Sequence, residues 1–410
     1  MTSPFVFVLT HESNPKRTDK STSIIALAIM RSLGQHGIAT VRVHPNRLDR
    51  SLSSRYCRGV EVCPDFYESE ERLVEFLLAM AKRYDGVRIL IPASDDCAYF
   101  LARHREALQG AFAVVGPTWA VMQKIMDKMG QYEQANAVGV PIPETYSPSS
   151  AAEVRKLAAE LQNYPYVIKP VVAHQWRLAS MQAVSKGKKG FAVRNAQELI
   201  ERYDDIARLD GRVMIQEVIG GRDERLYTFL GYIDNAGRPA AYCVRKKLRQ
   251  MPLDFGYCTA TVSCKDDVVV DQSVRLLQQV GYTGIVGVEW KLDPRTGTYK
   301  LIEINARAVN TIGIARACGV DIPYIAVLDQ LGQLTAPVTT WKEGVTWVNI
   351  IQDFWAAREL NQAGAMSYRQ WWRSIAGPRV DAVFSLSDPR PFAGYFGEFL
   401  GIAAKGLLRR

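Results

Sequence analysis

The first part of the chain alternates short apolar runs with segments of helical periodicity. The apolar runs are FVFVL (5–9), IATVRV (38–43), VRILIPA (87–93) and AFAVVG (111–116). Between them, residues 21–37 and 68–84 place apolar side chains every three to four positions, which is the spacing of an amphipathic helix. Strands that are apolar throughout and alternate with helices are typical of a parallel sheet covered on both faces. Residues 1–118 are therefore predicted to form a parallel α/β unit.

A second region follows a predicted helix at 122–139 and the turn-rich segment PIPETYSPSS (141–150). Its pattern predicts helices at 151–163 and 195–206 and strands at 166–171, 191–194 and 212–219. Two β-hairpins come next, one pairing 225–233 with 238–248 around DNAG, the other pairing 284–292 with 298–305 around DPRTG. Residues 336–410 are predicted to form a helical tail that carries tryptophans.

Composition narrows the class of protein. A chain of 410 residues that is 48% hydrophobic can bury two or three cores. The net charge of +9 is spread along the chain, which favours an anionic small molecule and argues against nucleic acid as a partner. The seven cysteines form an odd set without a CxxC pair, as expected of free thiols in a reducing compartment, so a cytoplasmic location is predicted.

No segment has the character of a signal peptide or of a membrane span. FVFVL is too short for a signal core, and IIALAIM (24–30) falls well below the roughly 20 residues that cross a bilayer. The last residues, 391–410, combine aromatic, small apolar and basic side chains. Such a segment can contact a membrane surface, and a helix packed on the core is the alternative.

The hairpin at 284–305 carries the most informative chemistry. Side chains along a strand alternate between its two faces. One face is predicted to pack inward through Val286, Val288, Trp290, Leu292, Ile302 and Ile304. Glu289, Glu303 and Asn305 then project from the opposite face. The hairpin therefore gathers three oxygen-bearing side chains on one surface.

The register of this hairpin sets how close the carboxylates come. If DPRTG is a five-residue loop that pairs Leu292 with Thr298, Glu289 lies opposite Leu301 and is a diagonal neighbour of Glu303. Two carboxylates about 4 Å apart repel by about 4 kcal/mol at an effective dielectric of about 20. Mg²⁺ relieves such repulsion and commonly takes one or two carboxylates plus phosphate oxygens.

The alternative is that the two glutamates form the ordinary solvated face of an amphipathic hairpin. Asn305 and Arg307 continue the same face and add a neutral oxygen ligand and an anion-binding guanidinium. Their presence favours the metal-site interpretation.

With these residues in view, the sequence resembles the ATP-grasp superfamily, through several motifs in the family's order. IEINAR (302–307) is similar to the family's terminal metal-binding strand. The resemblance implies that Glu289, Glu303 and Asn305 hold two Mg²⁺ ions, for which Mn²⁺ is an alternative. It also implies that Arg307 steadies the acyl phosphate.

The same resemblance implies a nucleotide site. The segment 126–145 is similar to one whose lysine reaches ATP phosphates, here Lys128, and YPYVIKP (164–170) is similar to the strand with a second nucleotide lysine, here Lys169, which is grouped with Arg307 as catalytic. RVMIQEVIGGRDERLY (212–227) resembles the hinge strand. It implies adenine contacts from Gln216, Glu217 and the backbone of Ile219, and a ribose contact from Asp223 or Glu224.

The chain departs from many family members after the second lysine, where a glycine-rich phosphate loop is replaced by residues 171–190. His174 and Arg177 fall in that segment, with His174 expected as a structural or substrate contact and Arg177 as a phosphate clamp. KPxxxHxW (169–176) and RKKLRQMPLDFGYCTATVS (245–263) look similar to carboxylate–amine ligases of the D-aspartate ligase type. By that likeness Lys246, Lys247 and Arg249 meet substrate or phosphate charge, and an exposed basic strand end is the alternative.

The resemblance covers residues 1–335 and implies an ATP-grasp fold, of the α/β and α+β classes, with a Rossmann-like N-terminal domain. The expected domains are a pre-ATP-grasp domain at 1–118, an ATP-grasp domain at 119–335 with lobes at about 119–212 and 213–335, and a helical extension at 336–410. Because related N-terminal domains often pair, a homodimer is expected.

The implied activity is that of an ATP-dependent carboxylate–amine ligase. It would form an amide or peptide bond through an acyl phosphate and release ADP and phosphate. The substrates would be small molecules such as an amino acid, a peptide or a nucleotide-linked precursor. A catalytically silent ATP-binding regulator or scaffold of the same fold is the alternative, and an oxidoreductase is disfavoured because the first turn, THESNPKRTDKS, lacks a GxGxxG fingerprint.

Overall fold

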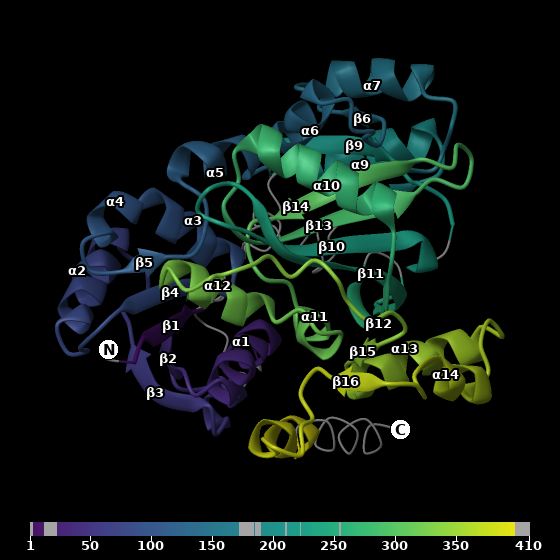
Figure 1. Ribbon diagram of the computed structural model, residues 1–410. Helices are drawn as coiled ribbons and strands as arrows, with labels where there is room; N and C mark the ends of the chain where they lie inside the picture. The colour runs from purple at the N-terminus through teal and green to yellow at the C-terminus, as the bar shows by residue number, and fades with distance from the viewer. Residues whose placement is uncertain are drawn as a thin grey trace.

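The computed structural model (Figure 1) describes residues 3–11, 23–171, 184, 190–209, 211–221, 223–253 and 256–397. These residues form three sheets, of five, four and seven strands, with helices packed on them. The mixture of a parallel α/β sheet with largely antiparallel sheets confirms the predicted fold class.

The N-terminal sheet is parallel and has the strand order β3-β2-β1-β4-β5. Its strands are β1 (Phe5–Leu9), β2 (Ala39–His44), β3 (Cys57–Val62), β4 (Arg88–Pro92) and β5 (Ala113–Val114). The helical segments of this region are α1 (Ile24–Gln35), η1 (Arg50–Ser53), α2 (Glu70–Ala81), α3 (Asp95–Arg103), α4 (Arg105–Leu108) and α5 (Trp119–Ile125).

Burial on both faces explains why the central strand of this sheet is apolar throughout. Val6 and Val8 of β1 join the core that includes α1, whereas Phe7 and Leu9 join a second core with α2 and α3. The strand order reverses between β1 and β4, and at such a point the carboxyl ends of the strands open a crevice. Helix α3 begins at that edge with Asp95.

The four-stranded sheet forms the smaller lobe of the middle region, in the order β6-β9-β7-β8. Its strands are β6 (Thr145–Tyr146), β7 (Tyr166–Pro170), β8 (Phe191–Val193) and β9 (Val213–Glu217). Its helices are α7 (Ala151–Glu160) and α9 (Ala196–Ala207), which share one apolar core with the sheet. Helix α6 (Lys128–Ala137) lies between this lobe and the large sheet and contacts β14. The predicted strands and the helices at 151–163 and 195–206 are confirmed, whereas the single helix predicted at 122–139 is two helices, α5 and α6, because Asp127 caps the start of the second.

The seven-stranded sheet has the order β14-β13-β10-β11-β12-β15-β16. Its long strands are β10 (Leu226–Ile233), β11 (Pro239–Met251), β12 (Tyr257–Cys264), β13 (Gly284–Leu292) and β14 (Tyr299–Asn305), and its short strands are β15 (Thr346–Val348) and β16 (Arg379–Asp381). Both predicted hairpins are present, β10–β11 and β13–β14. The remaining elements are η4 (Asp223–Arg225), α10 (Asp267–Val280), α11 (Gly313–Ala317) and α12 (Ile322–Gln330).

The C-terminal region contains helices α13 (Ile350–Gln362) and α14 (Tyr368–Ser374), as expected, but it also contributes two strands to the large sheet. Strand β15 pairs with β12, and β16 pairs with β15. Runs of three residues carry too little periodicity to signal a strand, and these form because the edge of β12 offers unpaired backbone groups. In Figure 1 the region lies at the bottom of the view, beside both the large sheet and the N-terminal unit.

Two buried acids fix this C-terminal region to the rest of the chain. Asp353 of α13 accepts hydrogen bonds from Arg249 of β11 at 2.8 and 2.9 Å, from Thr259 at 2.8 Å and from Trp371 at 2.7 Å. Asp388 accepts from Arg31 of α1 at 2.9 Å and from Ser54 at 2.7 Å. The first helix, the large sheet and the C-terminal region are thus tied together by charged hydrogen bonds.

No helix among the described residues is both long enough and apolar enough to cross a membrane.

Candidate active site

Glu289 of β13 and Glu303 of β14 lie directly opposite each other in the large sheet. The expected register was wrong in two respects. The ladder resumes at the pair Leu292 and Tyr299, so six residues lie outside it rather than five, and the register shifts again next to Glu289. Directly opposed residues of an antiparallel pair have Cβ atoms about 4.5–5.5 Å apart, closer than diagonal neighbours. The two carboxylates are therefore nearer to each other than predicted.

The second register shift also changes which side chains face the core. Leu301 pairs with Trp290, and both are fully buried, so Leu301 takes the inward position that was assigned to Ile302. The extra residue of the β-bulge is Ile302, which is only half-buried. Because a bulge re-aims the side chains that follow it, Glu303 comes to lie on the same face as Glu289.

Asn305 completes a set of three oxygen-bearing side chains on this face. It pairs with Gly287, one step of two along β13 from Glu289, and its amide donates to Glu303 Oε1 at 3.3 Å. All three side chains are half-buried. Within the part of the chain that the structure describes, no group of three or more His, Cys, Asp or Glu side chains is placed to hold a metal. Two carboxylates and one amide oxygen suit Mg²⁺ if phosphate oxygens complete its coordination.

Lys128 reaches this face from the first turn of α6. The helix starts at that residue because the side chain of Asp127 caps it by accepting from the backbone N–H of Gly130 at 2.8 Å. The ammonium of Lys128 donates to Glu303 Oε2 at 2.9 Å and to the carbonyl of Ile302 at 3.1 Å. Burial opposes the charged form, but the Glu303 carboxylate outweighs it and raises the pKa of Lys128 above its ordinary value. The lysine therefore holds a positive charge beside the carboxylate pair.

Lys169 approaches from the end of β7 in the smaller lobe and donates to the side-chain carbonyl of Gln216 at 2.5 Å. Burial, and then the nearby Lys128 ammonium, lower the pKa of Lys169 well below its ordinary value. Two lysines from different elements thus converge where positive charge is not fully balanced. A polyanion bound between them would restore the balance.

The two polar residues at the end of β9 point to opposite sides. Gln216 is buried, and besides accepting from Lys169 it donates to the hydroxyl of Tyr132 at 2.8 Å and to Thr145 Oγ1 at 2.7 Å. It therefore faces the lysines. Ile219, two residues beyond the strand, is also buried.

Glu217 faces the other way and is held by basic side chains. It forms an ion pair with Lys300 and lies 2.5 Å from Arg295, and it accepts the backbone N–H of Glu144 at 3.0 Å. Burial would raise the pKa of Glu217, but the hydrogen bond from Lys300 and the other donors lower it. The Glu217 carboxylate is thus engaged in structure, and its backbone N–H donates to the carbonyl of Glu144 at 2.9 Å.

Asp223 and Glu224 lie together in η4. Asp223 is half-buried and accepts from the amide of Gln250 in β11 at 2.9 Å, whereas Glu224 is exposed. Both stand at the entrance of strand β10, so the geometry keeps both as ribose candidates. His174 and Arg177 lie outside the described residues.

Arg307 follows β14 and meets a residue of the N-terminal unit. Its Nη2 donates to Asp95 Oδ2 at 2.8 Å, and its Nε lies 2.8 Å from Asp95 Oδ1. Burial would lower the pKa of Arg307, but Asp95 and then Glu303 raise it. Asp95 was not among the expected site residues, because a pairing across 212 positions leaves no local signal in the sequence.

The expected substrate residues Lys246 and Arg249 do not face the carboxylates. Lys246 occupies the opposite face of β11, beside the half-buried Tyr227, and Arg249 is committed to Asp353. Lys247, which was expected with them, does have the right orientation, and so does Arg245, which was not expected. The register places five residues in one row across adjacent strands: Glu303, Glu289, Thr228, Arg245 and Ser263.

Arg245 is a buried cation without an acidic partner among the described residues. Its Nη1 contacts Thr261 Oγ1 at 3.4 Å and Cys258 Sγ at 3.6 Å, and no described group accepts from its Nε. Lys247, also buried, donates to Gln250 Oε1 at 3.2 Å. The alternation of side chains along β11 could have identified these two residues. Arg245 and Lys247 lie on the same side of the strand as Cys243, whereas Lys246 lies on the other side.

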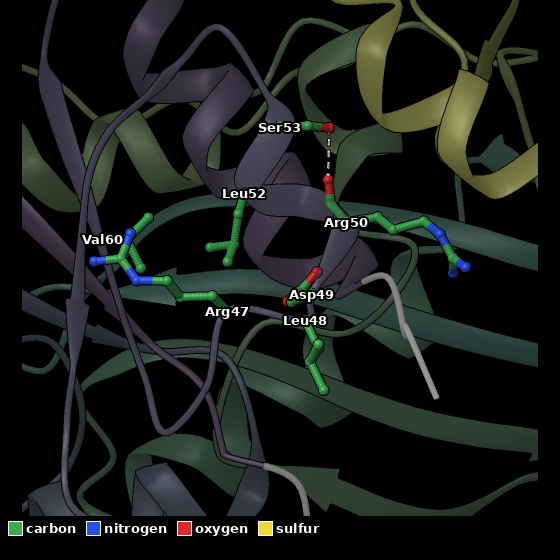
Figure 2. Close-up of a pocket in the computed structure, with 7 residues that line it drawn as sticks. All are labelled: Arg47, Leu48, Asp49, Arg50, Leu52, Ser53 and Val60. Carbon is green, nitrogen blue, oxygen red and sulfur yellow. Dashed lines mark hydrogen bonds between the residues drawn. The ribbon is translucent and has the colours of Figure 1, made fainter. Parts of the chain in front are cut away.

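A separate hollow of about 390 Å³ lies on the N-terminal unit (Figure 2). It is lined by Arg47, Leu48, Asp49, Arg50, Leu52, Ser53 and Val60. It belongs to the β2–β3 side of the sheet, across β1 from β4 and Asp95. The hollow is therefore not part of the carboxylate site.

Comparison with known proteins agrees with this arrangement. A family model described as "ATP-grasp in the biosynthetic pathway with Ter operon" matches residues 233–353, less than half of the chain. The D-aspartate ligase of Enterococcus faecium (strain Aus0004) is 25% identical over 272 residues, which cover 63% of this chain and 63% of that protein. The chain thus matches less than two thirds of that relative's length.

Two solved structures share the fold. An ADP complex of N5-carboxyaminoimidazole ribonucleotide synthetase has a TM-score of 0.63 at 12% identity, covering 88% of this chain and 85% of that one. The biotin carboxylase domain of Hydrogenobacter thermophilus 2-oxoglutarate carboxylase, in complex with MgADP, ADP and bicarbonate, has a TM-score of 0.61 at 18% identity, covering 82% and 71%.

The chain shares the fold of these solved structures, and residues 233–353 match an ATP-grasp family model. Within that class the chain is similar to carboxylate–amine ligases, as the D-aspartate ligase match confirms.

Proposed function

We propose that this protein is an ATP-dependent ligase that activates a carboxylate as an acyl phosphate and transfers the acyl group to an amine. The observation that carries the proposal is the opposed pair Glu289 and Glu303, with Asn305 beside it and Lys128 bound to Glu303. This arrangement would hold a divalent metal next to a triphosphate. The ATP-grasp fold and the D-aspartate ligase relative support it.

In the proposed reaction a substrate carboxylate oxygen forms a bond to the γ-phosphorus of ATP as the bond between that phosphorus and the β–γ bridging oxygen breaks, and ADP leaves. An amine nitrogen then attacks the acyl carbon, loses a proton and expels inorganic phosphate. Glu289, Glu303 and Asn305 would hold Mg²⁺, which supplies charge neutralisation on the phosphates when bound. We propose two ions, with Mn²⁺ as a substitute, because the set offers two carboxylates and an amide oxygen.

The basic residues would act on the phosphates from three sides. Lys128 and Lys169 would contact the nucleotide, with Lys169 regaining its proton as the triphosphate binds. Arg307 would face the transferring phosphoryl group while Asp95 fixes its orientation. The base would rest on the hinge after β9, near the backbone of Glu217 and Ile219, and Asp223 or Glu224 would receive the ribose.

Arg245 and Lys247 would form the anion-binding part of the substrate site, in place of Lys246 and Arg249. Arg245 lies two strands from Glu289 in the same row, which corresponds to about 10 Å between backbones. The intervening residue is Thr228, which has a short side chain. A substrate carboxylate can therefore lie between the metal ligands and Arg245.

The substrates we propose are an amino acid or another small carboxylate and an amine from an amino acid, a peptide or a nucleotide-linked precursor. Buried cations favour acidic substrates, and the relative's name, D-aspartate ligase, is consistent with that class. We also propose a homodimer and a cytoplasmic location. A silent ATP-binding role is not favoured, because the chain retains Lys128, Lys169 and all three metal-ligand candidates.

The test is release of ADP and phosphate by the full chain with Mg²⁺ and ATP, across a panel of D- and L-amino acids paired as carboxylate and amine donors. Glu303→Gln and Arg307→Ala are each expected to lose about a hundredfold or more in turnover. Circular dichroism should show that both remain folded, and Glu160→Gln, on the exposed side of α7, should behave as the parent. Near-parental turnover in both site variants would defeat the proposal.

A further inference from the structure

The C-terminal region concentrates the exposed apolar side chains of the described part of the chain. Twelve large apolar residues are exposed in the described part of the chain, and five of them fall between residues 368 and 396. They are Tyr368 (45% exposed), Trp372 (52%), Phe384 (43%), Leu386 (88%) and Phe396 (41%). Helix α14 buries none of its residues. This density of uncovered apolar surface calls for a partner.

The exposure of α14 is built into the fold. Within the helix, Trp371 is fixed by a hydrogen bond to Asp353 at 2.7 Å and by an edge contact with Phe354 at 5.9 Å between ring centroids. A capping box between Ser367 and Gln370 fixes the start of the helix. The helix is therefore held in place while Trp372 and Tyr368 face outward.

The same stretch of chain carries exposed positive charge. Four arginines between residues 366 and 397 are exposed: Arg369, Arg373, Arg379 and Arg390. The guanidinium of Arg379 lies over the ring of Trp372, 5.4 Å from its centroid. The two acids of the same stretch are used internally, Asp381 by the backbone N–H groups of Ile350, Val383 and Phe384 and Asp388 by Arg31. The surface presented to solvent is thus cationic and aromatic.

We propose that this surface, which comprises α14 and residues 379–396 and is here called the α14 surface, docks on an anionic lipid bilayer. Arginines near a negatively charged leaflet gain electrostatic free energy. Tryptophan and tyrosine favour the headgroup level, and Phe384 and Leu386 gain free energy by entering the acyl boundary. Charge alone would suit any polyanion, but the exposed apolar side chains select a surface with an apolar layer beneath its charges.

Docking through the α14 surface leaves the proposed ligase site open. Strands β15 and β16 form one edge of the large sheet, whereas β13 and β14, which carry Glu289 and Glu303, form the other. In Figure 1, α13 and α14 lie at the lower right of the molecule, with β16 beside them. The inference does not depend on the ligase activity, so the two can fail separately.

The test is co-sedimentation of the full chain with vesicles of phosphatidylcholine alone or of phosphatidylcholine with phosphatidylglycerol. The parent should bind the anionic vesicles and lose binding as salt is raised. Arg369→Ala/Arg373→Ala should weaken binding by roughly fivefold per arginine. Tyr368→Ala/Trp372→Ala should weaken it by about tenfold, through loss of interfacial apolar area. Lys156→Ala/Arg208→Ala removes two exposed charges from the smaller lobe and should match the parent.

A second measurement guards against loss of fold in the variants. Trp372→Phe keeps an apolar side chain, so the protein should still bind, but quenching of tryptophan fluorescence by brominated lipids should fall. The proposal is overturned if the parent does not bind anionic vesicles, as expected were the surface a site for an acidic protein. It is also overturned if the arginine and aromatic variants bind as the parent does, or if quenching is unchanged in Trp372→Phe.

Discussion

Arg307, just beyond the strand that carries Glu303, forms an ion pair with Asp95 at the start of α3, with two nitrogen–oxygen distances of 2.8 Å. Asp95 follows β4 of the N-terminal sheet and Arg307 follows β14 of the large sheet, so the N-terminal unit supplies part of the candidate site. A guanidinium that faces a transferring phosphoryl group has to be oriented before the reaction, and Asp95 is placed to do this.

We expect Asp95→Asn to lower turnover by about tenfold while leaving the KM for ATP nearly unchanged, because the nucleotide lysines are untouched. The variant should also lose about 1–3 kcal/mol of stability, since Arg307 keeps its charge and loses its acidic partner. Steady-state kinetics and thermal unfolding measure the two effects. Asp96→Asn, at the next position, is the matched control, and an equal loss of turnover there would contradict the role of Asp95.

Lys169 should take up a proton when the nucleotide binds. Its pKa is lowered by burial and by Lys128, so it is partly neutral above that lowered pKa, and a bound triphosphate favours the charged form. Binding should therefore weaken as pH rises through the pKa of the bound state. Calorimetry of MgATP binding in two buffers of different ionisation enthalpy reports the uptake. Lys169→Met should abolish it, and an unchanged uptake in that variant would show that another group titrates.

The same lowered pKa has a consequence for folding. The unfolded chain binds a proton at Lys169 that the folded chain binds weakly, so stability due to this group rises with pH between the lowered and the ordinary pKa. Lys169→Met should flatten that rise in urea unfolding measured across the alkaline range.

Arg245 and Lys246 are adjacent in β11 and face opposite sides of the sheet, so they make a matched pair. Arg245→Met should raise the KM for the carboxylate substrate by about tenfold or more, because a buried charge–charge contact is lost. The same change should leave stability unchanged or increase it, since it removes a buried cation that has no acidic partner. Lys246→Met should leave both KM values near the parental ones. The reverse pattern would place the substrate on the other face.

The pair Arg249 and Asp353 should behave as a structural bridge. Asp353→Ala is expected to cost about 3–5 kcal/mol, because it leaves Arg249 charged and buried. Arg249→Met/Asp353→Leu should recover most of that stability and retain ligase activity. Thermal melts followed by activity assays distinguish this from a substrate role, in which the double variant would fold but fail to turn over.

The sequence allowed prediction of elements whose signal is local. The apolar runs of the N-terminal sheet and the two hairpins follow from periodicity. The shared face of Glu289 and Glu303 was predicted too, but in the structure it depends on the longer turn and the β-bulge at Ile302 together. The register of the second hairpin cannot be predicted in this way. The alternation of side chains does not indicate where the turn ends or that a β-bulge lies at Ile302.

The partners of residues far apart in the chain could not be predicted from the sequence, for a related reason. Nothing near Arg307 indicates Asp95, and nothing near Arg249 indicates that Asp353 neutralises it. Arg249 was therefore taken for a substrate contact. The cations that face the carboxylates, Arg245 and Lys247, could be separated from Lys246 by the alternation of side chains, because the position of the strand was known.

The pairing of β15 with β12 bears on how this protein can be dissected. A cut near residue 335, where the motifs of the nucleotide-binding fold end, would uncover the backbone of β12 along a full edge and strip Arg249 of its counter-charge. Exposed strand edges recruit other chains. A chain truncated there should therefore self-associate. Biochemical work on this protein is best done with its C-terminal strands retained.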